Sequence, residues 1–206
     1  MCGFSGIVAE GYQQKHIESM CHMLTHRGPE NTTIYRYEKF WLGHSRLRII
    51  DLETGDQPIF NEDGTVGVIF NGEIYNFMDI KNTLETKGHL FKTSSDTEVL
   101  VHLYDEKGLD MFNDLNGIFS FAILDKKRKR VVLARDHFGV KPLFYYSSGQ
   151  QLIFASEAKA ILVHPDVPRK RNDHATHLLA NLRYIQSTQT PVSYTHLRAH
   201  ETREDR

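Results

Sequence analysis

The sequence is poor in cysteine, has no long apolar run and carries almost no net charge. Two cysteines in 206 residues exclude a disulfide framework and favour a reducing compartment. No stretch approaches the roughly 20 apolar residues of a membrane-spanning helix, and the N-terminus lacks the basic and apolar segments of a signal peptide. A net charge of −1 gives no electrostatic reason to expect a nucleic-acid or membrane partner. We therefore predict a cytoplasmic protein with neither partner.

What is present is the composition of an ordinary globular domain, with 40% hydrophobic and 25% charged residues. Apolar residues indicate helices in four places. The first stripe consists of Ile17, Met20, Cys21 and Leu24, and Gly28-Pro29 ends it. Two further helices are predicted around Phe77–Leu84 and Leu100–Tyr104, and a third, short one around Met111–Leu115.

Strand-like segments fill most of the remaining sequence. Asp63-Gly64 is a strong hairpin signal within the β-rich stretch 34–70. Strands are predicted at 4–8, 48–50 and 66–70. The later predicted strands are nearly continuous apolar runs, which is typical of strands covered on both faces; they span 119–124, 131–134, 143–146 and 152–155. Many strands joined by hairpins, with helices in separate blocks, predict an α+β fold. We expect a four-layer α/β/β/α sandwich of stacked antiparallel sheets.

The end of the chain reads differently from the rest. Residues 192–206 are polar and have no stripe that could be buried. This segment resembles translated adaptor sequence, and we predict that it is a non-native tail outside the fold.

Cys2 is the first residue with chemical promise. Aminopeptidases remove an initiator Met that precedes a small residue, so Cys2 is expected to become the mature terminus. One residue then carries both a thiol and a free α-amine, which act as nucleophile and base. Alone this signal is weak, because a cysteine at position 2 is far more often incidental.

Several segments then occur in the order found in one enzyme family. The segments are Cys2–Ile7, His26–Pro29, Arg46–Asp51, Gln57–Ile59, Asn71–Asn76, Ser94–Glu98, Arg135–Leu143 and Ala155–Ala160. Together they resemble the class II, N-terminal-nucleophile glutamine amidotransferases, and the last two resemble the asparagine synthetase branch. The resemblance implies an N-terminal-nucleophile hydrolase fold, a glutaminase domain over residues 2–165, and the start of a linker to an absent synthetase domain over 166–191.

The resemblance also implies roles for individual residues. Cys2 would attack the carboxamide of L-glutamine, and the side-chain amide of Asn71 with the backbone N–H of Gly72 would stabilise the oxyanion. Arg46 would bind the substrate carboxylate through its forked guanidinium, and Asp96 would bind the ammonium. The remaining wall of the glutamine pocket would be formed by Leu47, Arg48, Ile49, Ile50 and Glu73.

Each role has a plainer alternative on the residue alone. Arg46 fits a surface arginine on a strand, and Asp96 fits the N-cap of the helix that follows it. Asn71-Gly72 is a common hairpin turn. Gly72 also permits a close approach of backbone that a side chain would block.

Other candidate residues carry less weight. Cys21 lies on the apolar stripe of its helix and is predicted to be an inert core thiol. His22 and His26 have the spacing of a helical metal pair, but no third ligand is suggested, so no metal is predicted. The basic run 126–130 joins two apolar strands and is predicted to be a solvated hairpin.

The predicted activity is hydrolysis of glutamine to glutamate and ammonia through a Cys2 thioester. No cofactor is expected in this chain, because it has no phosphate-binding glycine loop. ATP and Mg²⁺ are expected only with the synthetase domain, where ammonia would convert aspartate to asparagine. The sequence leaves open whether the chain forms a homodimer. The rivals are the related amidotransferases that make phosphoribosylamine or glucosamine phosphate, and a degenerate interaction domain without turnover.

Overall fold

The strands form two antiparallel sheets in the computed structural model, which describes residues 1–48, 54–149 and 151–183. The first sheet has the order β2-β3-β1-β9-β8 and the second has the order β4-β5-β6-β7. The strands of the first are β1 (Gly3–Val8), β2 (Asn31–Tyr37), β3 (Phe40–Arg46), β8 (Phe144–Ser148) and β9 (Gln151–Ala155). Those of the second are β4 (Ile59–Phe60), β5 (Val66–Ile74), β6 (Gly117–Asp125) and β7 (Arg130–Arg135).

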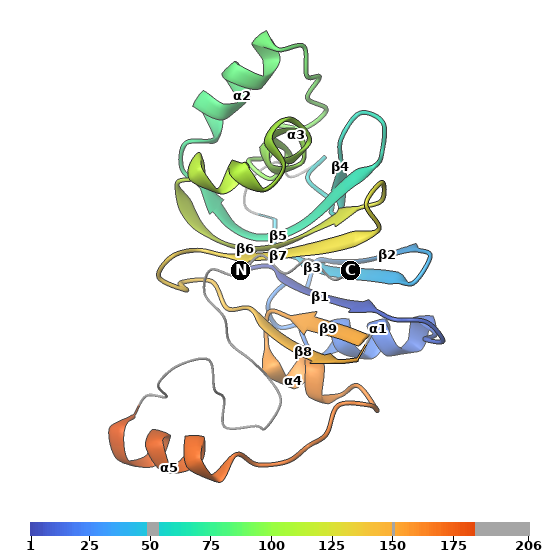
Figure 1. The fold of residues 1–206 in the computed structure, drawn as a ribbon, viewed down its shortest axis with the longest axis vertical. Helices are drawn as coiled ribbons and strands as arrows, with labels where there is room; N and C mark the ends of the chain where they lie inside the picture. Colours follow the sequence, from blue (N-terminus) through green and yellow to red (C-terminus); the bar gives the residue numbers. More distant parts are fainter. Residues whose placement is uncertain (49–53, 150, 184–206) are drawn as a thin grey trace.

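Helices cover the outer faces of both sheets (Figure 1). The first sheet carries α1 (Gln14–His22) and α4 (Ala158–Leu162), whereas the second carries α2 (Phe77–Thr86), α3 (Glu98–Lys107) and the 3₁₀ helix η1 (Gly108–Asn113). A last helix, α5 (Asp173–Leu182), lies beyond α4 at the opposite end of the molecule from α2 (Figure 1). The predicted α/β/β/α order of layers is confirmed.

Three apolar clusters separate these four layers. Along β6, Phe121 and Ile123 pack toward the helices, while Ala122 and Leu124 pack toward the other sheet. Since successive side chains of a strand point to opposite faces, a strand between two cores is apolar at every position. This geometry is the reason for the continuous apolar runs in the sequence.

The predicted local elements are also found, with shifted ends. The stripe of α1 is buried, although the α-helix ends at His22 and Leu24 lies in the turn that follows. The short third helix is 3₁₀ rather than α and stops before Leu115. Gly64 has a φ of +70° in the turn between β4 and β5, as the hairpin signal required.

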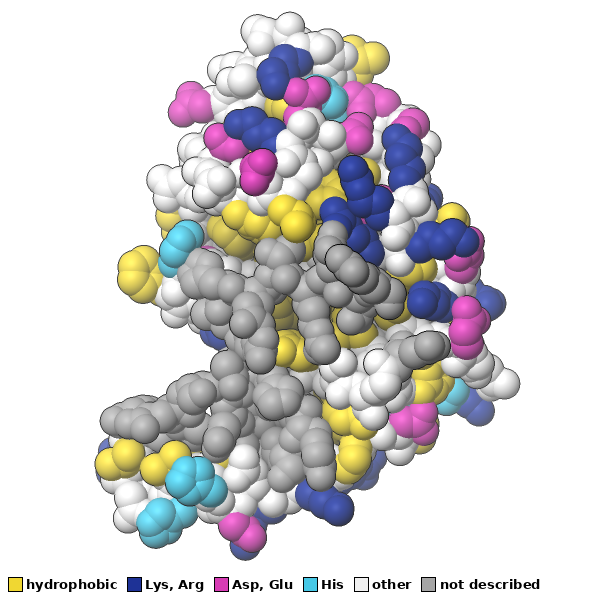
Figure 2. Space-filling view, in the orientation of Figure 1, with side chains coloured by type: hydrophobic (Ala, Val, Ile, Leu, Met, Phe, Trp, Pro, Cys, Tyr) yellow, Lys and Arg dark blue, Asp and Glu magenta, His cyan; other side chains and the backbone are white. Residues whose placement is uncertain are grey.

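Acidic and basic side chains are interspersed on the visible face over α2 and α3 (Figure 2). No helix in the described part of the chain is both long and apolar enough to cross a membrane.

Candidate active site

A cavity of about 170 Å³ opens where β1 begins and β3 ends, against the middle of β5 and the segment before α3. Its wall contains Cys2, Arg46, Leu47, Asn71, Gly72, Glu73 and Asp96, all of which were predicted from the sequence. Further lining comes from Met1, Gly55, Gln57, Phe70, Ser95, Thr97 and Lys141. The fold therefore brings together predicted site residues that are up to 94 positions apart in the sequence (from Cys2 to Asp96).

Three of the predicted wall residues are not found at the cavity. Two of them, Ile49 and Ile50, lie outside the described residues, and the third, Arg48, does not line the cavity. Arg48 is exposed, and its backbone N–H donates to Glu30 Oε2 at 2.9 Å. Arg48 is thus fixed beside the cavity by its backbone and is not part of the wall.

The Cys2 sulfur is held at the cavity by the chain that follows β3. Its Sγ lies 3.4 Å from the backbone nitrogen of Leu47 and 3.5 Å from the carbonyl oxygen of the same residue. The register of β1 against β3, with Gly3 opposite Ser45, places Cys2 next to this segment. A partly exposed thiol bordered by a backbone N–H can be reached by a small substrate.

A second group of residues, which the sequence reasoning did not assign to the site, fixes the backbone of Cys2. Arg27 Nε donates to the Cys2 carbonyl oxygen at 3.0 Å, and Arg27 Nη1 pairs with Glu157 Oε1 at 2.8 Å. Arginine 27 and Glu157 lie in two of the family-like segments, and that membership was the available signal. The Ser156 hydroxyl accepts a hydrogen bond from the Phe4 N–H, and the Ser156 N–H donates to the Phe4 carbonyl oxygen. The segments that contain Arg27 and Glu157 therefore both anchor the start of β1.

Glu157 is strongly acidic as a result of these contacts. Burial raises the pKa of its carboxyl group, but hydrogen bonds from Arg27, His26 and Lys159 outweigh that effect and lower the pKa to about 2. The Glu157 carboxylate therefore stays ionised at any pH at which the protein is expected to work, and it holds Arg27 in place.

Asn71 and Gly72 lie within β5 and do not form a hairpin turn. The Asn71 side chain is 2% exposed, and its Nδ2 is buried without a hydrogen-bond partner in the described structure. A buried amide donor without a partner costs roughly 1–3 kcal/mol, so most such groups in proteins are paired. Because Asn71 lines the cavity, a ligand oxygen would satisfy this donor.

The direction of the Gly72 N–H follows from its neighbours on β5. The N–H groups of Phe70 and Ile74 point away from β6, because they donate to Gln57 Oε1 at 2.6 Å and to Asp96 Oδ2 at 2.9 Å. Successive N–H groups of a strand alternate in direction, so the N–H of Gly72 faces the same side, between these two. It is therefore directed to the side of β5 where the cavity lies.

Gly72 is required by strand packing as well. A Cβ at this position would lie 2.3 Å from the carbonyl oxygen of Ile118 and 2.6 Å from the Phe119 Cα, both on β6. The close backbone approach predicted for Gly72 is thus an approach to β6. Any other residue would push β5 and β6 apart and would move the Asn71 amide with them.

Asp96 is a buried carboxylate of the cavity wall, and it does not cap α3. The N-cap position belongs to Thr97, and Asp96 Oδ2 instead accepts the Ile74 N–H. Its side chain is 4% exposed, and this burial, with the nearby charge of Glu73, raises its pKa above the ordinary value. A cation bound in the cavity would relieve the electrostatic cost.

Arg46 is buried at the end of β3 rather than exposed on a strand surface. Its Nη1 pairs with Asp56 Oδ1 at 2.5 Å, which orients the guanidinium at the cavity wall. Asp56 has a lowered pKa, because the bonds from Arg46 and Asn31 outweigh the effect of its burial. The cavity therefore offers a guanidinium and a carboxylate on different parts of its wall.

The remaining candidates fall outside the cavity. Cys21 is buried in the core beneath the first sheet, where burial raises the pKa of its thiol. His26 pairs with Glu157 at 2.9 Å and so belongs to the anchor of Cys2. Residues 126–129 form the turn between β6 and β7, as predicted, but Arg130 is not part of the solvated hairpin: it begins β7 and is buried.

Comparisons with known proteins identify relatives of this chain. A sequence model of the glutamine amidotransferase domain matches residues 1–201. Asparagine synthetase [glutamine-hydrolyzing] 2 of Bacillus subtilis is 46% identical over 84% of this chain. A putative glutamine-hydrolysing asparagine synthetase of Methanocaldococcus jannaschii is 37% identical over 84% of it. The solved glutamine phosphoribosylpyrophosphate amidotransferase of B. subtilis superposes with a TM-score of 0.66 and 26% identity, over 79% of this chain and 43% of that one.

The alignments cover only part of the curated relatives. The chain spans 24% of the length of the B. subtilis synthetase and 37% of that of the M. jannaschii protein. The family match, by contrast, extends over nearly all of the chain. With its stacked antiparallel sheets and its match to the domain model, this chain belongs to the class II glutamine amidotransferase domain family.

Proposed function

We propose that Cys2 is the nucleophile of a glutaminase reaction in this cavity. Once Met1 is removed, the α-amine of Cys2 accepts the thiol proton, and the thiolate attacks the side-chain carbonyl carbon of L-glutamine. The C–N bond breaks, the nitrogen takes up the proton and leaves as ammonia, and a γ-glutamyl thioester remains. Water then adds to the thioester, which yields glutamate and restores the thiol.

The observation that carries the proposal is the unpaired, buried Nδ2 of Asn71 beside a cavity that also contains the Cys2 sulfur. With the Gly72 N–H it supplies two donors for the negative oxygen that forms during attack. Such donors act without reorganisation, because β5 already fixes them. Few other roles would keep an unsatisfied amide in a protein interior.

The opposite charges on the cavity wall fit the head group of glutamine. We assign the α-carboxylate to Arg46 and the α-ammonium to Asp96, whose pKa is raised by burial in the absence of substrate. Leu47 and Glu73 complete the wall. Met1 lines the same cavity, so its removal would also open space for substrate.

The test is release of glutamate from glutamine by the purified chain. Cys2→Ala is expected to reduce release to background, whereas Cys21→Ala, a matched loss of the other thiol, keeps it. Intact-mass measurement of the wild type should show loss of Met1, and a glutamine-like electrophile should add one equivalent of mass at Cys2. Equal release by wild type and Cys2→Ala would remove the proposed nucleophile.

The fate of the ammonia is a second part of the proposal. We propose that it serves a synthetase domain that makes asparagine from aspartate with ATP and Mg²⁺, because the curated relatives are named glutamine-hydrolysing asparagine synthetases. A cytoplasmic location belongs to the same proposal, and it is supported by two free thiols. The test is asparagine formation from glutamine, aspartate and ATP when this chain is joined to the C-terminal part of such a relative. Glucosamine phosphate or phosphoribosylamine chemistry would be favoured if asparagine does not form while glutamate release persists.

A further inference from the structure

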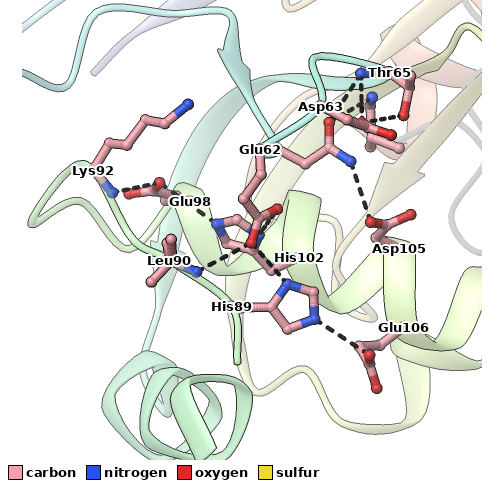
Figure 3. Close-up of polar contacts among 12 residues, drawn as sticks. Glu62, Asp63, Thr65, His89, Leu90, Lys92, Glu98, His102, Asp105 and Glu106 are labelled. Carbon is pink, nitrogen blue, oxygen red and sulfur yellow. Dashed lines mark hydrogen bonds and ion pairs between the residues drawn. The ribbon is translucent and has the colours of Figure 1, made fainter. Parts of the chain in front are cut away.

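Away from the cavity, two histidines surround one carboxylate at the α2–α3 end of the molecule (Figure 3). Glu62 follows β4, His89 follows α2, and His102 lies in α3. His89 Nδ1 lies 3.1 Å from Glu62 Oε1, and His102 Nδ1 lies 3.1 Å from Glu62 Oε2. One ligand-type atom from each residue lies within 4.8 Å of the other two.

His102 is buried, and protein contacts do not satisfy its ring nitrogens. It is 1% exposed, and neither ring nitrogen has a hydrogen-bond partner in the described structure. Carboxylate oxygens lie beside both nitrogens, from Glu62 at 3.1 Å and from Glu98 at 3.5 Å, but these contacts lack hydrogen-bond geometry. A metal ion coordinated by Nδ1 would supply the partner that this buried ring nitrogen lacks.

Both imidazoles have the same arrangement of partners. Each directs Nδ1 to Glu62, and each has a second carboxylate near Nε2, which is Glu106 at 3.3 Å for His89 and Glu98 for His102. Histidines that bind a metal commonly donate their other ring N–H to a carboxylate, which fixes the tautomer and makes the ligating nitrogen more basic. His89 has this hydrogen bond, to Glu106, and Glu98 lies on the same side of the His102 ring. The cluster therefore contains ligand atoms and their supporting carboxylates.

The charges of the cluster also favour a cation. Glu62 and Glu98 form their ion pairs with histidines, while Glu106 is paired with Lys87 at 2.5 Å. The carboxylates of Glu62, Glu98 and Glu106 thus all lie within 3.5 Å of the two imidazoles.

We propose that Glu62, His89 and His102 form a binding site for a divalent transition metal, with zinc as the best fit. Two imidazoles and one carboxylate are a recurrent zinc ligand set, and imidazole ligands argue against Mg²⁺ and Ca²⁺. Zinc–ligand bonds of about 2.0–2.1 Å put neighbouring ligands of a tetrahedral ion about 3.3 Å apart. The two Glu62–histidine contacts of 3.1 Å are close to that spacing.

Such an ion would join three segments that are distant in sequence: the turn after β4, the segment after α2, and α3. Glu98, which lies beside His102, also accepts the backbone N–H groups of Lys92 and Thr93. These residues lead into Asp96 on the cavity wall. The role of the metal is therefore structural, and it holds the segment that carries Asp96.

The experiment is titration of the untagged, chelator-treated full chain with Zn²⁺ by calorimetry, followed by substitution with Co²⁺. We expect one saturable equivalent, a higher melting temperature, and the visible absorption of tetrahedral Co²⁺. His89→Ala should weaken zinc binding more than about 100-fold, and Glu106→Gln about 10- to 100-fold, as for a supporting carboxylate. His22→Ala, which removes an exposed histidine elsewhere, should bind zinc as the wild type does.

The outcomes separate a built site from adventitious binding by histidines. No saturable binding, a Co²⁺ spectrum of the octahedral aqua ion, or unchanged affinity in folded His89→Ala would overturn the proposal. His89 and Glu106 are on the more exposed side of the cluster, so their variants are expected to fold, which circular dichroism checks. Because the readouts are affinity and spectrum, the result does not depend on the glutaminase activity.

Discussion

Two buried aspartates lie at opposite ends of the second sheet and have opposite electrostatics. Asp96 accepts the Ile74 N–H at one end of β5, while Asp125 ends β6 opposite Val66 at the other. Asp125 is 0% exposed, yet its pKa is lowered, because bonds from Arg128 and Tyr104 outweigh the effect of burial. The pKa of Asp96 is raised, because burial dominates there.

The difference separates a structural polar network from a binding site. At the Asp125 end, Tyr104 donates to Asp125 Oδ2 at 2.9 Å and accepts from Arg130 at 2.8 Å, so the charges are balanced within the protein. At the Asp96 end, the Asn71 Nδ2 is buried without a partner among the described residues, and the hydrogen bonds to the Asp96 carboxylate do not outweigh the effect of its burial. Proteins keep such costs where a ligand supplies the missing partner.

The largest expected effect is on stability at the Asp125 end. Asp125→Asn removes the carboxylate charge beside the buried Arg130 and should lower the free energy of unfolding by about 3–5 kcal/mol. Urea unfolding measures this change. The turnover number per folded molecule should stay within twofold of wild type, and a loss below about 1 kcal/mol would contradict the structural role of the network.

Asn71→Ala should lower activity strongly and leave stability nearly unchanged, which is the reverse of the effect of Asp125→Asn. We expect kcat for glutamate release to fall about 10²- to 10³-fold, since one oxyanion donor is lost. The free energy of unfolding should change by less than about 1 kcal/mol, because Nδ2 makes no protein hydrogen bond. Steady-state kinetics measures the change in kcat, and urea unfolding measures the change in the free energy of unfolding. A large loss of stability with unchanged kcat would assign Asn71 to the structural scaffold and not to the binding site.

A pH titration of stability distinguishes a third buried group, His44, from both aspartates. His44 Nε2 contacts the Phe70 carbonyl oxygen at 3.2 Å, and burial lowers its pKa from 6.5 to about 4. Between those pH values the unfolded chain binds a proton that the folded chain does not. Stability is therefore full above pH 6.5 and falls as the pH decreases, by on the order of 3 kcal/mol at pH 4.

His44→Gln keeps an N–H donor and should flatten part of this pH dependence. The pKa of His164 is also lowered to about 4 by burial, so it accounts for a further part of the fall in the same range. His22→Gln, at an exposed position, serves as the matched control. Identical pH profiles for wild type and His44→Gln would show that His44 is not the titrating group.

Asp96→Asn is expected to give the smallest effect and the most specific one. The KM for glutamine should rise about 10- to 100-fold, because the charge that binds the ammonium is lost while the amide oxygen can still accept the Ile74 N–H. The raised pKa of Asp96 means that its ionised form costs stability at neutral pH, so the variant should be slightly more stable than wild type. Reduced stability with an unchanged KM would assign Asp96 to the scaffold.

Much of the fold could be predicted from local patterns. The stripe of α1, the Asp63-Gly64 turn and the continuous apolar strands are each set by neighbours in sequence, and all are found. The cavity residues were predicted by resemblance and not by spacing. On the residues alone, Asp96 would have been taken as a helix cap and Asn71-Gly72 as a turn, and both alternatives are wrong.

What the sequence determined by itself is most of the strands and the helices α1, α2 and α3, since side-chain period and turn residues act over a few positions; α4 and α5 were not predicted. The tertiary structure alone decided that Arg27 reaches the Cys2 carbonyl, that the Gly72 N–H faces the side of the cavity, and that Glu62, His89 and His102 meet. These outcomes depend on strand register and helix packing. Both bring together residues whose separation along the chain carries no periodic signal.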